Sequence, residues 1–230
     1  MAVTTRQLVS DLRNLASSGS NPVEFKITDN QLLFWCNEIR SMLISQAIQK
    51  KQDLSDVWIQ IISCLQLEQV DSSECCNLPI GCYLLKSVKK IPITIETYSD
   101  NTITKVVKPT GEIISKSNSF EANYNKYNKY TGKNSNWYIK NGYLYITNEQ
   151  LLESVSAYGI FEDPSDLSNF VGCDNNTCFG WTSSYPCSLK MASDITNIVL
   201  KTKIFPFLQL PADNKNDGTN INEQPNTKGL

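Results

Sequence analysis

The sequence WYIKNGYLYIT, residues 137–147, carries the clearest local signal of the fold. Apolar and polar residues alternate on both sides of Asn141-Gly142, and this dipeptide readily adopts the left-handed backbone of a two-residue type I′ turn. The stretch therefore predicts a compact β-hairpin. The large side chains on its two strands are Trp137, Ile139, Tyr143 and Tyr145.

Further strand-like segments lie on both sides of this hairpin. They are rich in β-branched and aromatic residues that partly alternate with polar ones. Asp163-Pro164 is expected to end the last of them, and Pro92 favours an edge or bulge position. Together they predict five or six mostly antiparallel strands. The segments are 57–70, 82–98, 101–109 with a turn at Asp100-Asn101 before it, and 153–164.

Three segments have helical spacing of their apolar residues: 6–15, 28–51 and 188–203. The second has the strongest start signal, because Thr28 and Gln31 have capping-box spacing while Ile27 and Leu32 can form a hydrophobic staple. We predict an α+β fold in which N-terminal helices and a C-terminal helix pack with a mostly antiparallel β-sheet or small barrel. The expected organisation is one α+β domain over 1–210 (helical 5–51, β-rich 57–162, loop 163–187, helix 188–203) and a tail over 211–230.

The composition argues against several classes of protein. A net charge of −2 gives no general attraction to nucleic acid, and the absence of histidine removes the commonest general base and metal ligand. The sequence contains neither a phosphate-binding Gly-rich loop nor a nucleophile elbow. We therefore expect a protein that is not an enzyme, needs no cofactor and does not enter a membrane, made and assembled in the cytoplasm.

The helix over 28–51 has two adjacent apolar stripes, which indicate contacts on two sides. One reading places a partner surface there, with Leu33, Trp35, Cys36 and Leu43 as its residues. The other reading places both stripes in the core of the subunit, and the sequence does not decide between them.

Two segments are too polar to bury themselves. The Asn-rich stretch 117–136 predicts an exposed loop or arm. The tail over 211–230 is expected to be ordered only by partners, through residues that include Pro211, Asp213 and Asn214.

Eight cysteines leave the redox state open. Four thiolates could bind a structural zinc ion, but the spacing of the cysteines lacks the usual two-residue knuckle. Disulfides and ordinary reduced cysteines are the alternatives. The acidic group Glu162, Asp163 and Asp166 could hold a cation, and a solvated loop is the favoured reading. The candidate zinc ligands are Cys75, Cys82, Cys173 and Cys178.

Basic and aromatic side chains also gather along the strands. Lys86, Lys89 and Lys90, with Lys105 and Lys108 nearby, could touch passing DNA without reading its sequence, or could guard a solvated strand edge. The aromatic residues could bind sugar, although core and subunit-interface roles are favoured. These residues are Tyr124, Tyr127, Tyr130, Trp137, Tyr138, Tyr143 and Tyr145.

Several short segments follow one another in a recognisable order. They are WCNEIRSMLI (35–44), KSVKKIPITIE (86–96), YIKNGYLYI (138–146), GIFEDP (159–164), Tyr185-Pro186 before a helix, and FPFLQLPADNKND (205–217). This order resembles the head-to-tail connector, an adaptor or ring protein, of crAss-like and related short-tailed bacteriophages. The resemblance spans about Gln7 to Asp217.

This resemblance implies a virion protein at the head-to-tail neck that forms a ring of twelve copies below the portal. Its partners would be the portal protein and other ring or tail proteins, and DNA would pass through its channel. The alternatives are another neck or tail ring component and a glycan-binding virion module.

Overall fold

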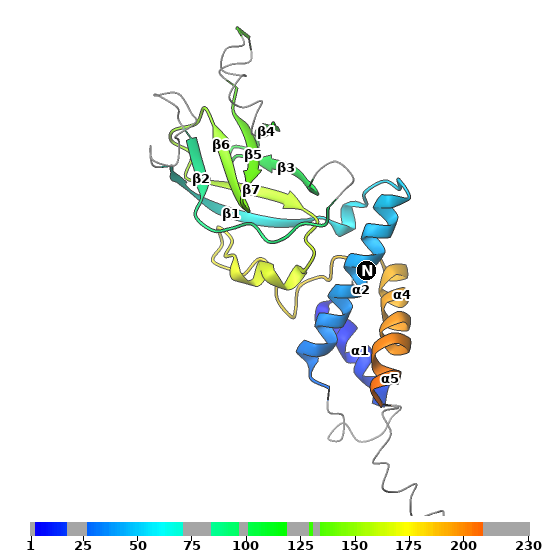
Figure 1. Ribbon diagram of the computed structural model, residues 1–230. Helices are drawn as coiled ribbons and strands as arrows, with labels where there is room; N and C mark the ends of the chain where they lie inside the picture. Colours follow the sequence, from blue (N-terminus) through cyan, green and yellow to red (C-terminus); the bar gives the residue numbers. More distant parts are fainter. Residues whose placement is uncertain are drawn as a thin grey trace, which may run out of the picture.

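The computed structural model describes residues 3–17, 27–70, 84–96, 101–118, 129–130 and 134–208 (Figure 1). It shows a β-barrel with a group of helices at one end. This architecture confirms the predicted α+β class and, of the two sheet forms expected, the small barrel. The division into a domain over 1–210 and a tail stays a prediction.

Seven strands form the barrel, and they close in the order β1-β2-β6-β5-β4-β3-β7. Every neighbouring pair is antiparallel except β4 and β5, which are parallel. The strands are β1 (Gln60–Gln69), β2 (Leu84–Ser87), β3 (Ile103–Val107), β4 (Ile113–Lys116), β5 (Asn136–Lys140), β6 (Tyr143–Thr147) and β7 (Ser154–Gly159).

The predicted hairpin is confirmed in β5 and β6, which pair from Asn136↔Thr147 to Lys140↔Tyr143. Asn141 and Gly142 both have positive φ, 54° and 80°, as a type I′ turn requires. Because side chains alternate across a strand, Trp137 and Leu144 point into the barrel, where both are buried. The Trp137 indole Nε1 donates to the carbonyl of Ile114 at 3.0 Å and so links β5 to β4.

Two strand predictions differ from the structure. The segment expected to run over 82–98 forms a continuous strand only as far as Ser87, and its later part makes an isolated bridge, Thr94↔Phe161. Pro92 lies in this later part, where it cannot donate to a ladder. Strand β4 was not predicted. It has four residues and buries one side chain, Ile114, so its sequence is too short to show an alternating pattern. Asp100 of the predicted turn, most of 117–136 and all of 211–230 lie outside the described residues.

The predicted helices form at one end of the barrel (Figure 1). Thr28 caps the helix Asp29–Gln49, where its hydroxyl accepts from the Gln31 N–H at 3.3 Å. Ser188 caps the helix Leu189–Val199 in the same way, since its hydroxyl accepts from the Met191 N–H. Ile27 and Leu32 are both buried, as a hydrophobic staple requires. The helices are α1 (Thr5–Ser17), α2 (Asp29–Gln49), α4 (Leu189–Val199) with a π-helical turn η4 (Leu200–Ile204), and α5 (Phe205–Leu208), with short 3-10 helices η2 (Asp56–Trp58) and η3 (Pro164–Asn169) between strands and helices.

One continuous core joins the helices to the barrel. Leu12, Leu32 and Ile195 from the helices belong to the same buried cluster as Ile62 and Ile146 from the strands. A smaller cluster of Ile44, Trp58, Ile95 and Ile160 fills the junction beside α2. No helix among the described residues is long and apolar enough to cross a membrane.

The turn of the hairpin gives a first testable prediction. Gly142→Ala should lower the free energy of unfolding by about 1 kcal/mol, because a Cβ at φ 80° is strained although space for it exists beside Lys90. Gly180→Ala is the matched control, since the nearest atoms to its added Cβ, the hydroxyl oxygens of Ser183 and Thr177, lie 3.9 Å away and its φ is not left-handed. Urea unfolding measures both variants. Equal stabilities would show that the turn is not left-handed.

Candidate functional site at the helix–barrel junction

The junction between α2 and the barrel is built around Arg40, whose side chain is fully buried. Its guanidinium donates to three main-chain carbonyls: Nε to Pro186 at 2.9 Å, Nη1 to Phe161 at 2.9 Å and Nη2 to Trp58 at 3.2 Å. These carbonyls precede α4, follow β7 and precede β1. One side chain of α2 therefore ties the helical part to the end of the barrel where β1 begins and β7 ends.

Burial works against the charge on Arg40 and lowers the pKa of its guanidinium. Arginine still suits the position, because its planar fork supplies donors in three directions at once and remains charged. Lysine could not reach the same three carbonyls in one plane. Arg40 thus has a structural role at the junction.

A second hydrogen-bond network is centred on Asn37, three residues before Arg40 on α2. The Tyr185 hydroxyl donates to Asn37 Oδ1 at 2.9 Å, and Asn37 Nδ2 donates to Asp163 Oδ1 at 2.8 Å and to Ser165 Oγ at 2.9 Å. Asp163 also caps η3, where its carboxylate accepts from the Ser165 N–H at 2.7 Å. The network fixes the start of η3 against α2.

The three carboxylates considered as a cation site therefore have different surroundings. Asp163 is engaged in the network, while Glu162 and Asp166 are exposed. Partial burial raises the pKa of the Asp166 carboxyl, and the neighbouring charges of Asp163 and Glu162 add to the rise. Among the described residues, no group of three or more acidic, cysteine or histidine side chains could hold a metal ion.

A groove runs along the exposed side of α2, between this helix and the segments 93–96 and 162–166. It consists of two adjoining hollows of about 910 and 450 Å³, which share Ser41, Ser45, Ile93 and Glu162 in their lining. Three exposed apolar side chains lie along it: Phe34 (55% exposed), Met42 (40%) and Ile93 (69%). We call it the α2 groove.

The partner surface predicted on this helix needs correction. Leu33 and Cys36 are buried in the core, and Trp35 and Leu43 are partly buried and packed against it. The sequence pattern could not show this, because α2 is covered by other helices and by the barrel junction on different sides. The apolar side chains that α2 does expose are Phe34 and Met42. Pro211, Asp213 and Asn214 lie outside the described residues.

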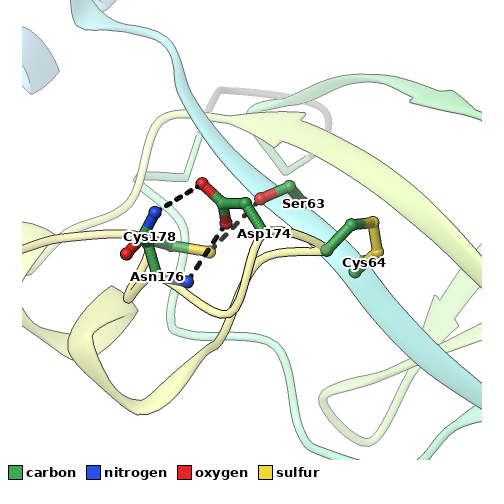
Figure 2. The surroundings of a disulfide bond; sticks show 6 residues. Ser63, Cys64, Asp174, Asn176 and Cys178 are labelled. Atoms are coloured by element: carbon green, nitrogen blue, oxygen red, sulfur yellow. Dashed lines mark hydrogen bonds between the residues drawn. A yellow bond between two sulfur atoms is a disulfide. The ribbon is translucent and has the colours of Figure 1, made fainter.

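The cysteines are used differently from the zinc hypothesis. Cys173 forms a disulfide with Cys64, a residue that the sequence reasoning did not single out (Figure 2). Cys178 lies 3.6 Å from the Ser63 hydroxyl, and Cys75 and Cys82 lie outside the described residues. The disulfide removes Cys173 from the candidate zinc ligands. Burial raises the pKa of Cys36 to about 12 and that of Cys187 to about 11, so both remain unreactive thiols.

The disulfide joins a distorted point of β1 to the loop that follows η3. Cys64 has φ 55° and lies where the β1–β7 register shifts. In the loop, the Asp174 carboxylate accepts from the main chain and the side chain of Asn176, at 3.1 and 2.8 Å (Figure 2). The loop is therefore ordered by its own hydrogen bonds and attached covalently to the barrel wall.

The predicted lysine group is brought together only in part. Lys86 and Lys90 lie over the Tyr143 ring, with Nζ 4.4 and 5.7 Å from its centroid, and Lys140 pairs with Tyr143 across the hairpin. Lys89 instead donates to the Asn169 carbonyl at 2.7 Å. We call Lys86, Lys90 and Lys140 the Tyr143 lysine cluster. Lys105 lies over Tyr158, and Lys108 is paired with Glu149 and Glu112.

The aromatic residues are mainly structural. Trp137, Tyr138 and Tyr145 are buried, and the rings of Tyr138 and Tyr145 stack with centroids 5.3 Å apart. Tyr130 is 86% exposed, while Tyr124 and Tyr127 lie outside the described residues. The buried rings leave little of this set for a sugar-binding surface.

The described residues thus form a small α+β subunit, a closed barrel with helices at one end and a groove along α2. The comparison with protein families gives the particular family: the model of phage tail ring protein 2 of crAss-like phages matches residues 7–224, and the chain belongs to this family. No curated protein matches the chain. The protein is accordingly a structural component of a phage tail ring, in which it assembles with other subunits of the virion.

The buried guanidinium gives the second prediction. Arg40→Met should lower the free energy of unfolding by about 3 to 5 kcal/mol, because it leaves three buried carbonyls without a donor. Lys50→Met, at an exposed position of the same segment, should change it by less than about 0.5 kcal/mol. Chemical denaturation followed by tryptophan fluorescence compares the two. If Arg40→Met lowers the free energy of unfolding by less than about 1 kcal/mol, the structural role of Arg40 at the junction is contradicted.

The disulfide gives the third prediction. Non-reducing peptide mapping should recover a peptide with Cys64 linked to one with Cys173. Cys173→Ser should lower the free energy of unfolding by about 2 to 4 kcal/mol, because the bond closes a long loop, with a sequence separation of 109 residues. Cys178→Ser is the control in the same loop. Alkylation of both Cys64 and Cys173 in the purified protein without reductant would show that the bond does not form.

Proposed function

We propose that the chain is the portal adaptor of its phage, a ring at the head-to-tail neck that provides a channel for DNA and a platform for tail proteins. Membership of a tail ring family carries the proposal. The fold supports it, because Arg40 joins a helical end and a barrel end into one rigid body that can contact different neighbours at each end.

The mechanism is associative. Identical subunits meet through unlike patches, and the rotation between them closes a ring, for which we propose twelve copies. The end formed by α2 and α4 would face the portal, and the barrel would make lateral contacts. Of the helix residues first assigned to partners, the partly buried Trp35 and Leu43 suit this role better than the buried Leu33 and Cys36.

The polar tail after Pro211 would fold on binding to a neighbouring protein. Coupled folding adds contact area at a cost in ordering, which makes attachment depend on a partner that is already in place. Pro211, Asp213 and Asn214 would lie in this contact. Lys86, Lys89 and Lys90 would touch DNA only if their strands line the channel, through contacts with phosphate that do not read sequence.

We propose no catalytic role and no cofactor, and assembly in the host cytoplasm before incorporation into the virion. A second candidate is a ring further down the tail, which the description of the family as a tail ring protein favours. The two candidates differ in their neighbour: an adaptor binds the portal ring, whereas a distal ring does not.

Native mass spectrometry of the protein alone and mixed with the portal of its phage tests the proposal. We expect a layer of about twelve subunits on the portal ring, and loss of this layer when the residues after Pro211 are removed. A ring that forms without binding portal would favour the distal position. A chain that remains monomeric under both conditions would contradict the ring altogether.

A further inference from the structure

The α2 groove combines an apolar floor with charges of both signs. Phe34, Met42 and Ile93 are exposed along it, so a chain that covers them removes apolar surface from water. The exposed Lys51 lines one of the two hollows, and the exposed Asp166 lines the other. The groove therefore suits a short polar segment that carries one apolar side chain and charges of both signs.

The C-terminal tail of the chain contains a segment of this composition. Over residues 212–229, Ile221 is the one large apolar residue, and it lies in the sequence NINEQPNTK, residues 220–228. Glu223 and Lys228 follow it in the same segment. Its asparagine and glutamine side chains can both donate and accept hydrogen bonds. We call residues 220–228 the tail segment.

The position of α5 lets the tail segment reach a neighbouring copy. Lys203, just before α5, pairs with Glu38 of α2 at 2.8 Å, and Glu38 lines the groove. Rotation about a ring axis does not change height, so the groove of the next copy lies close to the level at which the tail begins. Residues 209–219 span up to about 36 Å when extended, whereas three packed helices are at most about 30 Å wide.

We propose that the tail segment of each copy binds in the α2 groove of the next copy around the ring. This inference rests on the proposed ring and names the partner that orders the tail. Ile221 packs against Ile93, the most exposed apolar side chain of the groove. The polar side chains beside Ile221 meet the hydroxyl groups of Ser41 and Ser45, which line both hollows.

The charges set the direction of the tail segment in the groove. Lys51 attracts Glu223, and the acidic end around Asp166 attracts Lys228. Asp166 lies beside two other carboxylates, so an ammonium group at this end offsets their mutual repulsion. Because each copy gives one tail and receives one, every groove is filled only in a closed ring.

Photo-crosslinking from the groove tests the contact in the full chain. On rings assembled on the portal, Ile93→benzoylphenylalanine should link to the tail segment, and peptide mapping identifies the product. A mixture of isotope-labelled and unlabelled copies shows that the link joins two chains. Ile113→benzoylphenylalanine is the control, because Ile113 is similarly exposed, 62% against 69% for Ile93, and lies on β4 outside the groove. Links within one chain, or only to other segments, would overturn the contact.

Charge reversal is a second test. Lys228→Glu should weaken ring formation about tenfold in native mass spectrometry at low salt, because attraction at the acidic end becomes repulsion. Adding Asp166→Lys to the same chain should restore it. Lys215→Glu, earlier in the same tail, is the matched control and should leave ring formation unchanged. A loss that Asp166→Lys does not reverse would place the partner of Lys228 elsewhere and overturn the pairing.

The two possible failures are distinguishable. A wild-type chain that forms no ring, alone or on the portal, would overturn both the proposed function and this contact. Wild-type rings in which position 93 never links to the tail segment of another copy would overturn the contact alone.

Discussion

The subunit depends on one buried cation. Arg40 is excluded from water, and each of its three guanidinium nitrogens donates to a carbonyl, those of Trp58, Phe161 and Pro186. Moving a charge into the interior is costly, and the cost is offset only where the polar partners are fixed in advance. The three chain segments and α2 must therefore be in place together, which makes the helical end and the barrel one cooperative unit.

The rigidity of the subunit matters more in a closed ring than in a single copy. When one rigid body repeats around an axis, a small change in the angle between its two contact faces accumulates at every subunit, and the ring fails to close. The Arg40 junction and the neighbouring Asn37–Asp163 link fix that angle within the subunit. Stiffness at the junction is thus a requirement of closure as well as a source of stability.

The parts of the fold set by neighbouring residues could be predicted from the sequence. The turn at Asn141-Gly142 and the cap at Thr28 depend on interactions within a few positions, and both were confirmed. The α+β class followed from the sum of such local patterns.

The parts set by distant residues could not be predicted. Arg40 has the sequence appearance of an ordinary charged residue on a helix, and its three partners lie 18, 121 and 146 positions away. The pairing of Cys64 with Cys173 is equally remote. The apolar stripe that includes Leu33 and Cys36 was ambiguous for a related reason: periodicity shows that a face is covered, but the covering group is the subunit's own core. A cysteine with left-handed φ at a shift in strand register has no signature in sequence.

The parallel pairing of β4 with β5 places a requirement on the length of the Asn-rich stretch between them. Antiparallel neighbours can be joined by a tight turn, but parallel ones need a crossover of about a dozen residues or more to bring the chain back to the same starting edge. Strand β4 ends at Lys116 and β5 begins at Asn136, so the sequence between them is long enough for such a connection. The length of this stretch, whatever its residue types, is therefore compatible with the one parallel pair of the barrel.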